Sequence, residues 1–266
     1  LNLAPQLLAA LRDENALTLH SALLAHCLLQ GREVSVDDLE GAGVLSAVHA
    51  ALAEAAEGAA GQEAPQLDFA MLDAALGVAE EAFAQQQEAA AEEGSKHRKQ
   101  CGGGPSSCHH VLLVELGELA HALELLAHLC LALAHAMHAP LLDRCATCCQ
   151  LLASLAAPAS ASGAIPGLSS QGVSVLIEAL AVVAQWHHFA GSSPSDTAMG
   201  PSVPRGLQRR VLAVIGWAVA GEASAEVRAV ASAGVEQLLQ DRAFGDDPEA
   251  LADARQLMSM TMPSMT

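Results

Sequence analysis

Three stretches of the chain carry a Gly-Val pair that precedes apolar residues at helical spacing. They read EGAG-VLSAV around Gly43, SSQG-VSVLI around Gly172 and ASAG-VEQLL around Gly234. Glycine gives the backbone a tight, sterically open entry to a helix, and the aliphatic stripe that follows needs a neighbouring layer to bury it. Because a unit of this kind cannot bury its apolar face alone, the pattern predicts stacked helical repeats, that is, an α-helical solenoid.

The residue composition also favours an all-α fold. Hydrophobic residues make up 52% of the 266 residues, and Ala and Leu, the strongest helix formers, supply most of them. Aromatic residues are 2% and Tyr is absent, which argues against strands, because strands favour aromatic and β-branched side chains. At about 40–47 residues a repeat, the length suits about five repeats. We therefore expect one repeat domain over residues 1–266.

Four segments interrupt the helical pattern. Polar, Gly- and Ser-rich or Pro-containing sequence at 85–108, 158–171 and 191–203 predicts flexible loop insertions, and 259–266 predicts a frayed C-terminus. The first residue is Leu rather than Met, so we expect the chain to be a fragment or a processed form.

Charge and cysteine content restrict the partners and the compartment. The net charge of −18 repels phosphate backbones, so we expect no nucleic-acid partner. The longest apolar stretch, 111–137, contains three glutamates, so we expect no membrane span. Seven cysteines, an odd number and partly inside helical patterns, indicate free thiols in a reducing compartment, and we expect a cytoplasmic protein.

The order of long and short helices resembles the armadillo-repeat family. In the stretches 15–57 and 207–241, a long helix is followed by a short helix that ends in a small residue plus Gly, and then by a helix that begins with Val. The resemblance implies a right-handed armadillo-like solenoid with a protein-binding concave groove, although HEAT-like stacking fits the same pattern. The groove would be lined by the long helices at 17–30, 67–83, 142–157 and 207–220.

The partners that this resemblance implies are other proteins, bound along the groove. Arg and aromatic residues dominate binding hot spots, and an Arg in so acidic a chain could hold a carboxylate of the partner. The alternative for each Arg is an ion pair with a neighbouring carboxylate of the same chain. The residues that we predict to bind protein are His20, Arg144, Arg209, Arg210 and Trp217.

One group of His and Cys residues has the spacing of a zinc site. His135-x-x-His138 and Cys145-x-x-Cys148 offer two ligands one helical turn apart on either side of a turn at Pro140. Buried thiols and a histidine that caps a helix account for the same residues equally well. We therefore expect no metal or other cofactor, and keep the zinc site as an alternative.

Two further groups have weaker spacing. One is a series of histidines at every seventh position. They lie on one helix face, but successive histidines are about 10 Å apart, which is too far to share one ion. Its members are His121, His128 and His135. The other could form a soft-metal loop and consists of Cys101, Cys108, His109 and His110.

No sequence pattern typical of catalysis is present. The chain has no G-x-S-x-G element and no phosphate-binding G-K-[ST], and its carboxylates are dispersed along helices. We therefore expect a non-enzymatic scaffold or adaptor that is a subunit of a larger assembly. The Ala-rich, Gln-containing sequence with polar insertions resembles proteins of green algae and suggests a cilium or the cytoskeleton. The alternatives are the zinc module and a regulatory repeat domain of a larger enzyme.

Overall fold

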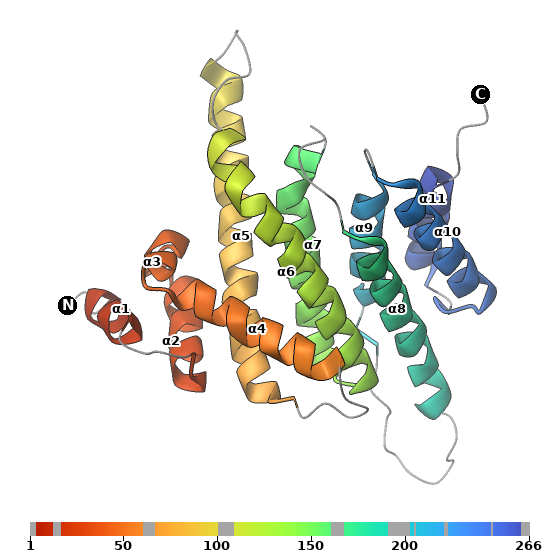
Figure 1. Cartoon of the computed structure of the whole chain (residues 1–266), viewed down its shortest axis with the longest axis horizontal. Coiled ribbons are helices and arrows are strands. Elements are labelled where there is room, and N and C mark those ends of the chain that lie inside the picture. Colours follow the sequence, from red (N-terminus) through yellow and green to blue (C-terminus); the bar gives the residue numbers. More distant parts are fainter. Residues whose placement is uncertain are drawn as a thin grey trace. The chain divides into compact units, whose positions relative to one another are not determined.

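The computed structural model consists of helices, as the composition predicts (Figure 1). The structure describes residues 4–12, 17–60, 67–100, 109–160, 168–190, 203–204, 206–220, 223–245 and 247–261. Within these ranges there are eleven helices and no strand. Their bounds are α1 (Ala4–Arg12), α2 (Leu19–Gln30), α3 (Val36–Gly41), α4 (Val44–Ala60), α5 (Phe69–Gln100), α6 (His109–His135), α7 (Ala139–Ser160), α8 (Ser170–Ala190), α9 (Leu207–Val219), α10 (Ala225–Gln240) and α11 (Pro248–Thr261).

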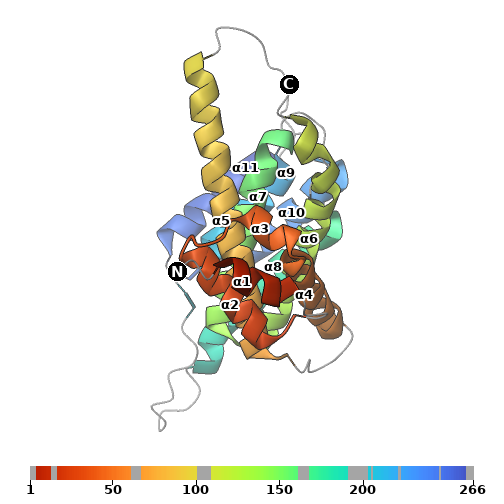
Figure 2. The same cartoon turned by 90° about the vertical axis from the view of Figure 1, so that its left-hand side faces the viewer.

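The helices form two compact units, Leu1–Glu115 and Leu116–Thr266. In unit 1, α5 packs against α2, α3 and α4, and α4 also contacts α2 and α3. The C-terminal part of α5 extends beyond α2, α3 and α4 (Figure 2). The core of this unit consists of aliphatic side chains, among them Ala25, Leu28, Leu29, Leu39, Val48, Leu72, Leu76 and Val78.

Local signals in unit 1 act where the sequence predicts. Gly31 ends α2, and Ser35 caps the short helix α3. Gly43 has φ +77°, a left-handed conformation that favours glycine, and α4 begins at the next residue. The expected order of a long, a short and a long helix between residues 15 and 57 is therefore confirmed.

The polar tract that follows Phe83 belongs to a helix. We predicted an insertion at 85–108, but α5 is helical through Gln100, so residues 85–100 extend the helix instead. The first residue of the tract contacts another helix of unit 1, since Gln85 Nε2 donates to the carbonyl oxygen of Leu29 in α2. Residues 101–108 lie outside the described ranges.

The other expected interruptions fall mainly outside the described residues. α7 ends at Ser160 and α8 begins at Ser170, which leaves 161–167 of the expected insertion at 158–171 undescribed. Residues 191–202 of the expected insertion at 191–203 are also outside. At the C-terminus α11 reaches Thr261, so the first part of 259–266 is helical, and 262–266 are not described.

Unit 2 has two layers of helices (Figure 1). α8 packs against α10 in one layer, and α7, α9 and α11 follow one another in the other layer. α6 joins the layer of α8 through a hydrogen bond from Trp186 Nε1 to the carbonyl oxygen of Ala134, 3.1 Å long. The core between the layers contains the side chains of Leu129, Leu133, Leu142, Leu152, Leu176, Trp186, Ile215 and Val235.

Two of the three glycines in Gly-Val pairs, Gly172 and Gly234, do not open helices. Gly172 is the third residue of α8, and Gly234 lies inside the single helix α10, where a short helix was expected to end and a second one to begin. A Cβ atom at Gly234 would lie 2.4 Å from Cδ1 of Ile177 in α8, and one at Gly172 would lie 2.6 Å from Cδ1 of Leu168. These two glycines allow close packing, whereas Gly43 alone of the three permits a turn.

The hydrogen bonds that cap α3 should stabilise unit 1. Ser35 Oγ accepts a hydrogen bond from the Asp38 backbone N–H, and the Asp38 carboxylate accepts from Ser35 N–H at 3.0 Å. We expect Ser35→Ala to lower the free energy of unfolding of unit 1 by about 1 kcal/mol, measured by urea denaturation. Ser46→Ala, at an exposed position of α4, is the matched control and should change it by less than about 0.5 kcal/mol.

The pH dependence of the same cap follows from Asp38. Hydrogen bonds from the Ser35 backbone and side chain lower the pKa of Asp38 below its ordinary 3.8. The carboxylate therefore stabilises unit 1 above pH 3.8, and this contribution is lost as pH falls through the lower, folded-state pKa. Asp38→Asn should be less stable than the parent chain at neutral pH and equally stable once both are in strong acid. A difference that stays constant with pH would contradict this account.

Candidate functional site

The two arginines of α9 that we predicted to bind protein form ion pairs within unit 2. Arg209 donates to Glu249 and, at 2.8 Å, to Asp253, both in α11, and the hydrogen bond to Asp253 raises the pKa of the guanidinium. Arg210 pairs with Asp143 of α7. These ion pairs connect α9 to α7 and α11, its neighbours in the same layer. They match the alternative for each Arg, an ion pair with a carboxylate of the same chain. A docking role for them remains a prediction.

The other predicted protein-binding residues do not gather at one place. His20 is exposed in the first turn of α2, in unit 1. Arg144 of α7 and Trp217 of α9 are partly buried in unit 2. The Nε1 atom of Trp217 is buried and has no acceptor among the described residues. Their role in binding is untested.

Of the four residues of the zinc alternative, only Cys145 belongs to a group of three close ligand atoms in the described part of the chain. His135 is exposed, and His138 Nδ1 accepts a hydrogen bond from the Leu141 N–H at 3.4 Å, near the start of α7. Cys145 and Cys148 are fully buried. These observations fit the other interpretation, in which the histidine caps a helix and the thiols are buried.

The histidines at every seventh position of α6 do not share one environment. In α6, His128 Nδ1 lies 2.8 Å from the carbonyl oxygen of Glu124, whereas His121 and His135 are exposed. Cys101 and Cys108 of the expected soft-metal loop lie outside the described residues.

A cluster of three thiols lies in the core of unit 2. Cys145 and Cys149 are one turn apart on α7, and Cys130 faces them from α6. The three sulfur atoms lie within 4.8 Å of one another, with 4.0 Å between Cys130 Sγ and Cys149 Sγ. Cys145 Sγ donates to the carbonyl oxygen of Leu126 at 3.4 Å. We name Cys130, Cys145 and Cys149 the thiol cluster.

Burial and mutual hydrogen bonds make the three thiols unequal. Burial raises the pKa of Cys145, and the hydrogen bond with Cys130 raises that of Cys149. Hydrogen bonds with Cys145 and Cys149 lower the pKa of Cys130 to about 5. A negative charge in this buried space is disfavoured unless hydrogen bonds or a cation offset it.

The thiol cluster was not predicted as a group. The spacing suggested a pair of Cys145 and Cys148, three residues apart, whereas the structure brings Cys145 together with Cys149, four residues apart. Both spacings put two side chains on one helix face, so the spacing alone does not decide between them. The deciding partner, Cys130, is on another helix.

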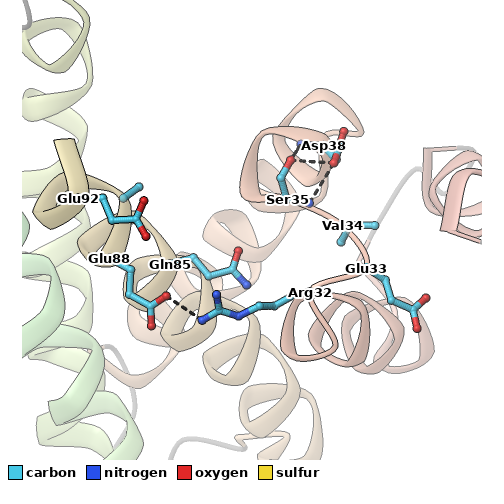
Figure 3. A pocket seen from close by; sticks show the side chains of 9 residues that line it. Arg32, Glu33, Val34, Ser35, Asp38, Gln85, Glu88 and Glu92 are labelled. Atoms are coloured by element: carbon cyan, nitrogen blue, oxygen red, sulfur yellow. Dashed lines mark hydrogen bonds and ion pairs between the residues drawn. The ribbon is translucent and has the colours of Figure 1, made fainter. Parts of the chain in front are cut away.

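Unit 1 has an acidic hollow of about 380 Å³ at the turn between α2 and α3 (Figure 3). Its wall includes four carboxylates and one guanidinium. The lining residues are Arg32, Glu33, Val34, Ser35, Asp38, Gln85, Glu88, Ala89 and Glu92. We name this site the acidic hollow.

Contacts between the turn and α5 hold the acidic hollow in place. Gln85 Nε2 donates to the carbonyl oxygen of Leu29 at 3.0 Å, near the end of α2 where helix carbonyls lack intrahelical partners. Arg32, which has φ +54°, forms an ion pair with Glu88 at 2.7 Å. In Figure 3, Glu88 and Glu92 project from α5 on the side of this turn, whereas Glu33 points away from them.

The residues of the acidic hollow were not among those predicted from the sequence. Gln85, Glu88, Ala89 and Glu92 follow the spacing of one helix face, which is the signal that could have revealed them. Because this face is polar, we interpreted the tract as the start of an insertion.

No helix in the described ranges is both long enough and apolar enough to span a membrane. Comparison of the chain with protein-family models, with curated proteins and with solved structures finds no match.

Proposed function

We propose that this chain is a non-catalytic, protein-binding scaffold or adaptor built as an armadillo-like solenoid of about five repeats. Two features support the repeat architecture. The order of α2, α3 and α4 follows the long, short and long pattern of one repeat. In unit 2, alternate helices pack side by side in two layers, which is how stacked helical repeats bury their apolar stripes.

The partner that we propose for unit 1 is a basic segment of another protein, bound at the acidic hollow. The observation that carries this proposal is the lining, in which carboxylates outnumber the guanidinium by four to one. Arg32 neutralises Glu88, and the hydrogen bonds to Ser35 keep Asp38 ionised. A Lys or Arg side chain entering the hollow would therefore meet a negative potential, and the net charge of −18 would attract it from a distance.

The expected affinity is modest, because these carboxylates are accessible to water. Glu88, for example, has 60% of its side chain exposed. Ion pairs in such surroundings contribute about 0.2–1 kcal/mol each and weaken with salt. The chain as a scaffold would therefore depend on several weak contacts along its length rather than on one strong pocket.

The test uses a short fluorescein-labelled peptide of Lys, Arg and Ala, titrated with the full chain and followed by fluorescence anisotropy. We expect binding that weakens as salt rises, and no binding of a matched peptide of Glu, Asp and Ala. The double variant Glu88→Gln and Glu92→Gln should weaken binding about threefold to tenfold, because it removes two carboxylates from the hollow.

The matched control makes the same charge change elsewhere. Glu178→Gln with Glu236→Gln alters two exposed positions of α8 and α10 in unit 2. If this control weakens binding as much as the variant in the hollow, overall charge alone attracts the peptide and the proposed site is wrong.

The state of the cysteines supports a cytoplasmic location. All five cysteines in the described ranges are free thiols. Thiols persist where glutathione and thioredoxin keep proteins reduced. We therefore propose that the protein works in a reducing compartment, the cytoplasm.

A further inference from the structure

We propose that Cys130, Cys145 and Cys149 bind a soft, thiophilic metal ion through their three sulfur atoms, with monovalent copper as the best match. This inference concerns unit 2 and is independent of the acidic hollow. The thiol cluster combines three good ligands of one chemical kind from two helices, all of them fully buried. Soft thiolate ligands select copper(I), zinc and related ions over hard cations.

The separations between the sulfur atoms match a three-coordinate ion. In an equilateral triangle of sulfur atoms 4.0 Å apart, which is the distance from Cys130 Sγ to Cys149 Sγ, the centre is about 2.3 Å from each corner. This is about the length of a metal–thiolate bond, as in zinc–sulfur bonds of about 2.3 Å. At the upper limit of 4.8 Å, side-chain movements of a few tenths of an ångström would close the triangle.

The number of ligands favours copper(I) over zinc. Structural zinc sites are almost always four-coordinate. In the part of the chain that the structure describes, the ligands that come together here are three cysteines, with no fourth His, Cys, Asp or Glu in the group. Copper(I) is a closed-shell ion that two or three thiolates can coordinate fully, so it does not need a fourth ligand.

Metal binding also removes the need for hydrogen-bond acceptors for the buried thiols of the thiol cluster. Three buried thiols can donate to only a few acceptors, and Cys145 uses the carbonyl oxygen of Leu126. Each copper–thiolate bond that forms displaces one S–H proton to solvent, and neither copper nor sulfur changes oxidation state. The +1 charge of copper(I) offsets one of the three thiolate charges, which the protein interior otherwise disfavours.

The experiment is an anaerobic titration of the reduced full chain with copper(I) in competition with bathocuproine disulfonate. Three further cysteines, Cys27, Cys101 and Cys108, are first replaced by Ser. We expect one copper(I) per chain, and X-ray absorption should show three sulfur neighbours at about 2.3 Å. Bound copper should also raise the unfolding temperature, because the ligand set exists only in the folded state.

A matched pair of variants distinguishes this site from thiols that serve only as core. Cys145→Ala and Cys148→Ala each remove one fully buried thiol from α7, but only Cys145 belongs to the thiol cluster. We expect Cys145→Ala to lower the copper affinity about tenfold or more, and Cys148→Ala to leave it within about twofold.

Three results would overturn the proposal. They are no copper uptake by the reduced folded chain, an equal loss of affinity in Cys145→Ala and Cys148→Ala, and nitrogen or oxygen rather than sulfur as the main neighbours of copper. The X-ray absorption measurement tests the proposal even if Cys145→Ala does not fold, because this measurement needs only the thiol cluster of the parent chain.

Discussion

Trp186→Ala should lower the free energy of unfolding of unit 2 by about 3–5 kcal/mol, the largest effect that we expect from one substitution. Trp186 is the bulkiest of the buried side chains described and is 2% exposed. Its indole Nε1 donates to Ala134 in the last turn of α6, so it joins α8 to α6 by packing and by a hydrogen bond. Alanine would leave a large cavity and remove the donor from this carbonyl oxygen.

Trp186→Phe separates the two contributions. Phenylalanine keeps most of the volume but cannot donate, so we expect a loss of about 1–2 kcal/mol. Ala134 retains one donor in this variant, the N–H of Met137 at 3.1 Å. The measurement is urea denaturation followed by the fluorescence of Trp217, which remains in both variants and also lies in unit 2.

Trp217 supplies the matched control for Trp186. Its indole Nε1 is buried without an acceptor among the described residues, so Trp217→Phe removes an unsatisfied donor. We expect this change to be neutral or slightly stabilising, within about 1 kcal/mol. Equal losses in Trp186→Phe and Trp217→Phe would show that the hydrogen bond to Ala134 does not stabilise unit 2.

Gly234→Ala should destabilise unit 2 by about 1–2 kcal/mol, although alanine is the better helix former. A Cβ atom at Gly234 would lie 2.4 Å from Cδ1 and 2.8 Å from Cγ2 of Ile177. Rotation about χ2 of Ile177 moves Cδ1 but not Cγ2, and the branch at Cβ restricts rotation about χ1, which would move both. Overpacking of this kind costs about 1–3 kcal/mol, which outweighs the gain in helix propensity of about 1 kcal/mol or less.

Two further variants test the cause of this effect. Gly58→Ala, in α4, meets no atom within 4 Å and should stabilise unit 1 by about 0.5–1 kcal/mol. In an Ile177→Ala background the clash is removed, so Gly234→Ala should no longer destabilise. If Gly234→Ala is harmful in both backgrounds, contact with Ile177 is not the reason for glycine at this position.

Local signals explain which parts of the fold could be predicted from the sequence. The caps and stops of unit 1, such as Ser35 before α3 and Gly43 before α4, act through hydrogen bonds and dihedral angles within one turn. The start of α7 next to Pro140 depends on similar local constraints. Helices were therefore placed well wherever a nearby residue sets the boundary.

The candidate sites were harder to predict, because their partners lie far away in the sequence. Gln85 contacts Leu29, which is 56 residues away, and Cys130 contacts Cys149, 19 residues away. A sequence pattern shows which residues share a helix face, but not which face of another helix meets it. The zinc alternative grouped Cys145 with residues near it in sequence, His135, His138 and Cys148, and left out Cys130 for this reason.

The helical character of this chain and the start of many helices follow from the amino-acid sequence, because propensity, capping and glycine conformation are local properties. The use of the glycines and cysteines depends instead on how the helices pack. Gly234 could have opened a helix or admitted a neighbour, and the position of Ile177 on α8 selects the second use. Cys145 could have joined a histidine or another thiol, and the packing of α6 on α7 brings Cys130 to it. Both outcomes depend on how two helices are rotated and spaced against each other, which no single stretch of sequence specifies.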